Sequence, residues 1–226
     1  MAHCRKHRRA LIALSALLLV LAVPGWASQV LVYSQGPDYL NLYASQNDIS
    51  GGANFTSYDN FTLASATTIT SVGWTGGYFN PQTPGSITSW AVAFYANNAG
   101  QPGALLSSFP ISGNGGETSV GVDSLGDPVY AYGAAISFAA GAGTEYWLSV
   151  VPSIAFPPEW GWTSSSTGDG VSYTDDAFGN RTQNSSDLAF SLYETQTKTV
   201  PEPGGLLLMG TGFVGIAAGL RRKFRA

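Results

Sequence analysis

Apolar and polar residues alternate along short segments in the middle of the chain. In residues 89–96, Trp90, Val92 and Phe94 share one face of an extended segment, and the alternation recurs in residues 188–193. This period of two is typical of β-strands, and residues 28–198 show no long apolar stripe with helical spacing. The predicted strands are 29–33, 55–63, 67–74, 89–96, 105–109, 118–122, 129–138, 145–151, 160–165 and 188–193.

Clusters of Gly, Pro, Asn and Asp separate these segments, for example at residues 80–85, 97–103, 113–116 and 126–128. Many short strands with turn residues between them predict an antiparallel β-sandwich or jelly roll. No repeat of fixed period stands out, which disfavours a β-helix or a propeller. We therefore predict an all-β fold with one domain over residues 28–194.

The two ends of the chain have a different pattern. Basic residues between positions 5 and 9 precede an apolar run at 10–23, and small residues then place a cleavage point before Ser28. This order is typical of a secretory signal peptide. We expect residues 1–27 to form a signal helix that signal peptidase removes.

A second apolar run covers residues 204–220 and is followed by a basic tail at 221–225 that includes Arg221, Arg222 and Lys223. Its length is at the short limit of the ~17–25 residues that span a bilayer. The run predicts a transmembrane helix with a basic stop, either processed after insertion or kept as a permanent anchor. Residues 195–199 are predicted to be a polar linker.

Basic clusters outside both apolar runs place both ends in the cytoplasm by the positive-inside rule, so residues 28–199 are expected across the membrane. The C-terminal pattern resembles the PEP-CTERM sorting signal of Gram-negative bacteria, on the triplet Pro201-Glu202-Pro203 and the segment that follows it. The resemblance covers residues 200–226 only. It implies processing by an exosortase, transfer of a membrane-anchored precursor to the cell surface, and association with exopolysaccharide.

Composition limits the chemistry of the middle segment. Residues 28–199 contain two basic side chains, Arg181 and Lys198, against 13 Asp and Glu, a net charge of −11. Such an acidic chain is repelled by phosphate backbones, so we expect no binding to nucleic acid. The same segment has no His, Cys or Met, which excludes His-activated nucleophiles and makes a zinc site implausible.

Aromatic residues near glycine-rich turns are one candidate binding surface. Trp160 and Trp162 flank Gly161 and therefore share one face of an extended segment. Exposed rings would stack on sugars, which predicts a carbohydrate-binding site at this pair. The alternative is that these tryptophans fill the core of the sandwich, the usual location of such side chains.

Acidic loops are a second candidate. The segments 123–127 and 169–176 offer carboxylate oxygens of the kind that calcium prefers, although neither matches the usual calcium-loop pattern. In the alternative interpretation, these Asp side chains accept hydrogen bonds from backbone amides of turns. We expect no required cofactor, with calcium as the one candidate.

Paired carboxylates are a third candidate, because a glycosidase needs two of them across a cleft, ~5–9.5 Å apart. Glu145, Glu159 and Asp187 are the residues considered for this role. The absence of His and Cys argues against catalysis, so we expect a non-catalytic surface or matrix protein. The alternatives are a lectin-like module and a carboxylate-dependent glycosidase.

Overall fold

The computed structural model describes residues 27–197. The predicted signal helix, the predicted transmembrane helix, the Pro-Glu-Pro triplet and the basic stop lie outside the described residues. Within residues 27–197 there is no helix that is long and apolar enough to cross a membrane. Residues Gln29–Thr195 form one compact unit.

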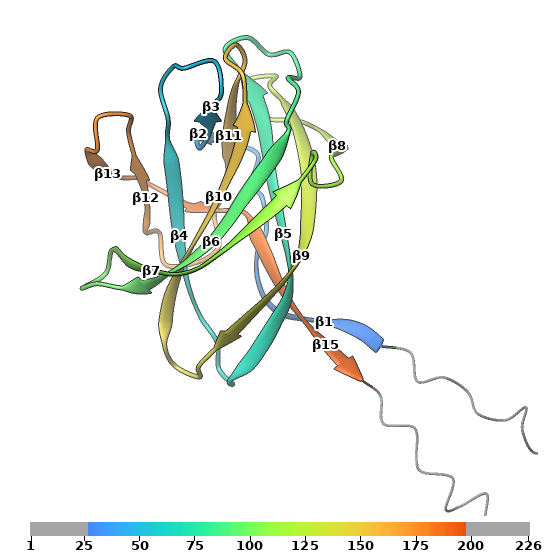
Figure 1. Cartoon of the computed structure of the whole chain (residues 1–226), viewed down its shortest axis with the longest axis vertical. Helices are drawn as coiled ribbons and strands as arrows, with labels where there is room; N and C mark the ends of the chain where they lie inside the picture. Colours follow the sequence, from blue (N-terminus) through green and yellow to red (C-terminus); the bar gives the residue numbers. More distant parts are fainter. Residues whose placement is uncertain (1–26, 198–226) are drawn as a thin grey trace, which may run out of the picture. The chain divides into compact units, whose positions relative to one another are not determined.

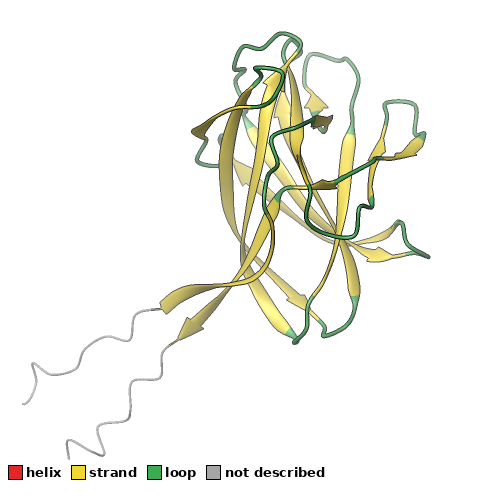
Figure 2. Cartoon of the chain, turned by 180° about the vertical axis from the view of Figure 1, so that it is seen from behind, coloured by secondary structure: helices red, strands yellow, loops and turns green. Residues whose placement is uncertain are grey.

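The described chain is all-β, and its strands form two sheets joined by loops (Figures 1 and 2). The predicted fold class is thereby confirmed. The strands are β1 (Ala27–Gln35), β2 (Leu42–Ala44), β3 (Asn47–Asp48), β4 (Thr56–Thr62), β5 (Thr67–Phe79), β6 (Ser89–Asn97), β7 (Pro102–Ser112), β8 (Thr118–Val122), β9 (Pro128–Ala140), β10 (Glu145–Ile154), β11 (Glu159–Ser165), β12 (Ser172–Asp175), β13 (Arg181–Gln183), β14 (Asp187–Leu188) and β15 (Phe190–Thr197).

One sheet has the order β1-β15-β5-β11-β14, with β2 paired to β11 and the β8–β9 hairpin attached to β5. The other has the order β13-β12-β4-β10-β6-β7, with the short β3 paired to β10. The β3–β10 pair is parallel, and the other ladders among β2 to β15 are antiparallel. The architecture is a twisted antiparallel sandwich.

The core lies between the sheets and is rich in aromatic side chains. On β6, the alternating residues Trp90, Val92 and Phe94 are all buried, as the period-two pattern requires. The ring of Phe94 stacks on that of Phe138 from β9, with 4.1 Å between the ring centroids. Aromatic contacts of this kind join the inner faces of the two sheets.

A second, smaller cluster covers the outer face of β4 and β10. It consists of Tyr58, Trp147 and Tyr173, with Tyr95 packed against them. Tyr173 belongs to β12, a strand that the sequence pattern did not predict and that pairs with β4. Both faces of β4 are therefore covered, which explains why five consecutive residues of this strand are buried.

The C-terminal strand corrects the predicted linker. β15 continues to Thr197, so the first part of the expected linker at residues 195–199 is strand. The strand neighbours β1 (Figure 1), and Ser34 and Ser191 form a hydrogen bond between them at 2.9 Å. Pairing with β1 satisfies backbone groups that a free linker would leave to water.

Candidate functional site

The predicted carbohydrate-binding pair is wrong. Trp160 and Trp162 both have 0% of their surface exposed. The Trp160 indole nitrogen donates to the hydroxyl of Tyr132 at 3.2 Å, and that of Trp162 donates to the carbonyl of Ala189 at 2.8 Å. A ring must be exposed to stack on a sugar, so these side chains are core residues.

The physical reason is the direction in which their shared face points. Both tryptophans of β11 belong to the main core, where Trp160 packs against Trp90 of the opposite sheet. Gly161 between them points to the other face of β11 and pairs with Ala44 of the neighbouring strand β2. An added Cβ at Gly161 would lie 2.8 Å from the Cβ of Leu42. The two tryptophans do share one face, but Trp160–Ser165 are buried on both faces of β11, and the alternation alone does not reveal that.

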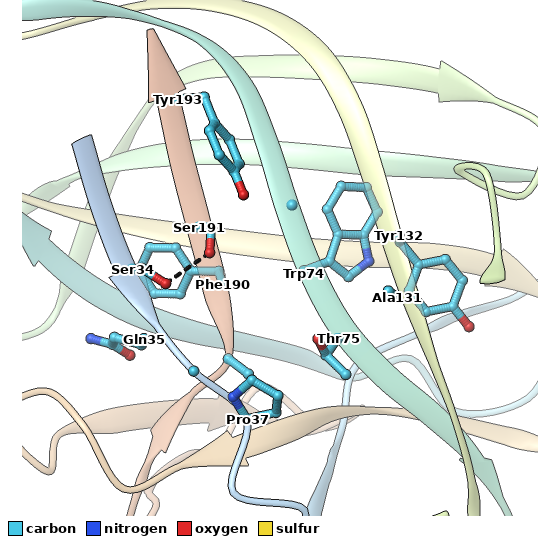
Figure 3. A pocket seen from close by; sticks show the side chains of 13 residues that line it. Ser34, Gln35, Pro37, Trp74, Thr75, Ala131, Tyr132, Phe190, Ser191 and Tyr193 are labelled. Atoms are coloured by element: carbon cyan, nitrogen blue, oxygen red, sulfur yellow. Dashed lines mark hydrogen bonds between the residues drawn. The ribbon is translucent and has the colours of Figure 1, made fainter. Parts of the chain in front are cut away.

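The structure instead has a groove of about 270 Å³ over β1, β5, β9 and β15 (Figure 3). Its lining includes the backbone of Gly73 and the side chains of Thr75, Ser34, Ser191 and Tyr193. Because Gly73 has no side chain, the groove is open between its neighbours. The groove combines an aromatic ring with several hydroxyl groups, and the sequence pattern did not single it out.

The carboxylates considered for glycosidase chemistry do not form one pair. Asp187 lies opposite Ser165, six positions along β11 from Glu159. At ~3.3 Å per strand residue, this places Glu159 and Asp187 about 20 Å apart. That separation is too large for two carboxylates that act on one glycosidic bond.

Glu145 belongs to a different group of polar side chains. The amide nitrogen of Asn60 donates to Glu145 at 3.0 Å and to Asp169 at 2.9 Å. Asp187, next to Asp169, accepts the backbone amide of Gly170 with both carboxylate oxygens, each at 3.0 Å. These carboxylates hold the loop before β12 and the start of β10 in place.

Asp59 is the most enclosed acid of this group. It lies on the inner face of β4 with 0% exposure, and it accepts the backbone amide of Leu188 from the other sheet. When the side-chain amide of Gln35 on β1 is turned over so that both of its polar atoms are satisfied, its nitrogen donates to the same carboxylate at 2.8 Å. Burial raises the pKa of Asp59 well above its usual value, and the charge of Asp187 adds to that effect.

The acidic loops mostly hold turns. Asp123 accepts the amides of Leu125 and Asp127, and Asp176 accepts those of Phe178 and Asn180. The segment 169–176 is a loop only in part, because Ser172–Asp175 is strand β12. Within residues 27–197, no group of three or more His, Cys, Asp or Glu side chains is arranged to hold a metal ion.

Comparison with protein families gives a match at the C-terminal end. The PEP-CTERM protein-sorting motif matches residues 199–223, which include the Pro201-Glu202-Pro203 triplet and the basic Arg221 to Lys223. No curated protein matches the chain. The motif lies outside the described residues and says nothing about the sandwich.

Proposed function

We propose that this chain, which carries a PEP-CTERM protein-sorting motif, is targeted to an exosortase for export and delivery to the cell surface. In this proposal, its β-sandwich is a non-catalytic component of the envelope or extracellular matrix. The sorting motif at residues 199–223 is the observation on which this proposal rests. In this function, the precursor loses its signal peptide, is held in the membrane by the segment 204–220, and is then cut near Pro201-Glu202-Pro203. The mature sandwich associates with exopolysaccharide.

Several features of the sandwich support a role without catalysis. The carboxylates Glu159 and Asp187 lie far apart along β11, and Asp187 is occupied by backbone amides. The tryptophans are in the core. These side chains stabilise the fold, and their geometry offers no acid–base pair for hydrolysis.

The surface charge supports an indirect association with anionic polymers. Arg181 is the only basic side chain within residues 27–197, and its guanidinium is paired with Asp175 at 2.7 Å. An acidic polysaccharide therefore meets no uncommitted cation on the described part of the chain. Neutral polysaccharides, or acidic ones bridged by divalent cations, fit this surface better.

Sorting is tested by the intact mass of the mature protein in strains with and without the exosortase. We expect the wild type to lose both ends, and the exosortase mutant to retain residues 204–226. Substitution of Pro201 and Glu202 by Ala is expected to give the same retention. A matched Thr195→Ala change in β15 leaves the triplet intact and is expected to be processed normally. Retention of residues 204–226 in the wild type would identify a permanent anchor instead.

The groove in Figure 3 favours a second candidate, a carbohydrate-binding module. The Tyr193 ring and the hydroxyls of Ser34, Thr75 and Ser191 are the groups that stack on a sugar ring and bond its hydroxyls. Binding on a glycan array that is lost in Tyr193→Ala, but kept in the distant Phe178→Ala, would support this candidate. No binding by the wild type would leave the matrix role as the better account.

A further inference from the structure

The hairpin between β8 and β9 contains a turn built on one aspartate. Oδ1 of Asp123 accepts the backbone amides of Leu125 at 2.8 Å and of Asp127 at 2.9 Å. The Asp123 amide in turn donates to the carbonyl of Asp127 at 2.9 Å. Gly126 completes the turn with a φ of 89°, a value that suits glycine.

The same design occurs a second time, between β12 and β13. Oδ1 of Asp176 accepts the amides of Phe178 at 2.9 Å and of Asn180 at 2.8 Å, and the Asp176 amide donates to the Asn180 carbonyl at 3.0 Å. Gly179 has a φ of 82°. The second turn therefore serves as an internal reference for the first.

The two turns differ in their last residue. In the second turn, the side-chain amide of Asn180 donates to Oδ2 of Asp176 at 2.9 Å. In the first turn, Asp127 occupies the place of that asparagine, and an ionised carboxylate has no hydrogen to donate. Oδ2 of Asp123 accordingly has no hydrogen-bond partner in the described part of the chain.

Both carboxylates of the first turn are removed from water. Asp123 and Asp127 each have 6% of their surface exposed. Burial and the charge of Asp123 raise the pKa of Asp127, while a hydrogen bond from Gln82 opposes them. The single basic residue within 27–197, Arg181, is paired with Asp175 and does not neutralise this pair. A buried, unpartnered carboxylate oxygen next to a second acid is costly unless a cation or a proton fills the gap.

We propose that Asp123 and Asp127 bind a calcium ion between their side chains. Oδ2 of Asp123 and the Asp127 carboxylate supply oxygens of the kind that calcium prefers. Water completes the coordination sphere, because only two acidic side chains take part. With so few charged ligands, we expect affinity in the range of about 10⁻⁴–10⁻³ M that is typical of extracellular calcium modules.

The test is thermal unfolding of the purified full-length chain in detergent, first with EDTA and then with calcium chloride, near pH 7.5. Saturating calcium is expected to raise the wild-type Tm by about 2–4 °C. Magnesium chloride at the same ionic strength should have a smaller effect, since magnesium demands a more regular geometry.

Asp127→Asn is the decisive variant, because it turns the first turn into a copy of the second. The new amide donates to Oδ2 of Asp123, so this variant is expected to unfold at a higher temperature than the wild type in EDTA and to lose the calcium response. The control Asp176→Asn leaves the Asp123–Asp127 pair intact and should keep the full response.

Two outcomes would overturn the proposal. One is a wild-type Tm that does not change with calcium up to about ten times the weakest expected dissociation constant. If the Tm of that wild-type protein instead rises at lower pH, and this rise is absent in Asp127→Asn, then Asp123 and Asp127 share a proton and bind no ion. The other is a calcium shift that persists in Asp127→Asn, which would place the ion elsewhere. Neither outcome bears on exosortase processing, so the proposed function is tested separately.

Discussion

The indole nitrogen of Trp160 lies 3.2 Å from the hydroxyl oxygen of Tyr132, and both side chains are buried in the core. The Tyr132 hydroxyl donates in turn to Glu117 at 3.0 Å, and Tyr78 donates to the same carboxylate oxygen. Burial raises the pKa of both tyrosines, which keeps their hydroxyls protonated as donors. A chain of hydrogen bonds thus links the centre of the core to the segment before β8.

Removing one hydroxyl tests this chain. Tyr132→Phe leaves the Trp160 nitrogen without an acceptor and Glu117 with one donor fewer. We expect a loss of about 1–3 kcal/mol in the free energy of unfolding, measured by urea denaturation. The control Tyr130→Phe removes the hydroxyl of the tyrosine two residues earlier on β9 and should stay within about 0.5 kcal/mol of wild type. Equal effects of the two variants would contradict the hydrogen-bond chain.

Gly76 is required by the close approach of β11 to β5. An added Cβ would lie 2.1 Å from Cζ2 of Trp160 and 2.5 Å from the carbonyl oxygen of Gly161. We expect Gly76→Ala to destabilise the domain by about 1–3 kcal/mol or more, because a buried ring and backbone must both move. Gly36→Ala meets nothing within 4 Å and should be close to neutral. The measurement is the midpoint of thermal or urea unfolding.

The buried acid Asp59 makes stability depend on pH. Its pKa is raised by burial and by the charge of Asp187, so the folded state holds a proton more tightly than the unfolded chain does. The resulting stabilisation is complete below the unfolded value near ~3.9 and is lost as the pH rises through the folded pKa. We therefore expect the urea concentration at the unfolding midpoint to decrease as the pH is raised from mildly acidic to mildly alkaline.

Asp59→Asn removes this titration. The variant should be less stable, because its amide group faces backbone donors, but its stability should change less with pH. Asp48 contributes in the opposite sense, since a hydrogen bond from Ser50 lowers its pKa and its contribution is lost at strongly acid pH. An unchanged pH slope in Asp59→Asn would show that other acids, such as Asp187, control it.

Arg181 is expected to contribute to the stability of the folded domain through the geometry of its guanidinium group as well as through its charge. Its guanidinium contacts both oxygens of Asp175, at 2.7 and 2.8 Å, and its Cζ lies 5.3 Å from the ring centroid of Tyr58. Arg181→Met should cost about 1 kcal/mol at low salt and less at high salt, measured by urea unfolding. Arg181→Lys retains the charge without the planar guanidinium group, and its stability should lie between that of the wild type and that of Arg181→Met.

The strand pattern could be predicted largely from the sequence, because residues that alternate between a core and a second face have a period of two. β6 and β11 lie close to their predicted positions. The short strands β2 and β3, and the hairpin β12–β13, were missed, because such short segments show too few alternations to be recognised. β5 runs past its predicted end, since Gly76 and Gly77 pair with β9 and β11 despite their low strand propensity.

The sequence alone revealed the sorting motif, because the order of a Pro-Glu-Pro triplet, an apolar run and a basic tail is a linear feature that needs no folded partner. It also determined the acidic charge and the fold class. Only the tertiary structure decided that Trp160 and Trp162 are buried, and that Oδ2 of Asp123 lacks a donor. Burial and pairing depend on which surfaces meet across the two sheets, and the local order of residues does not contain that information.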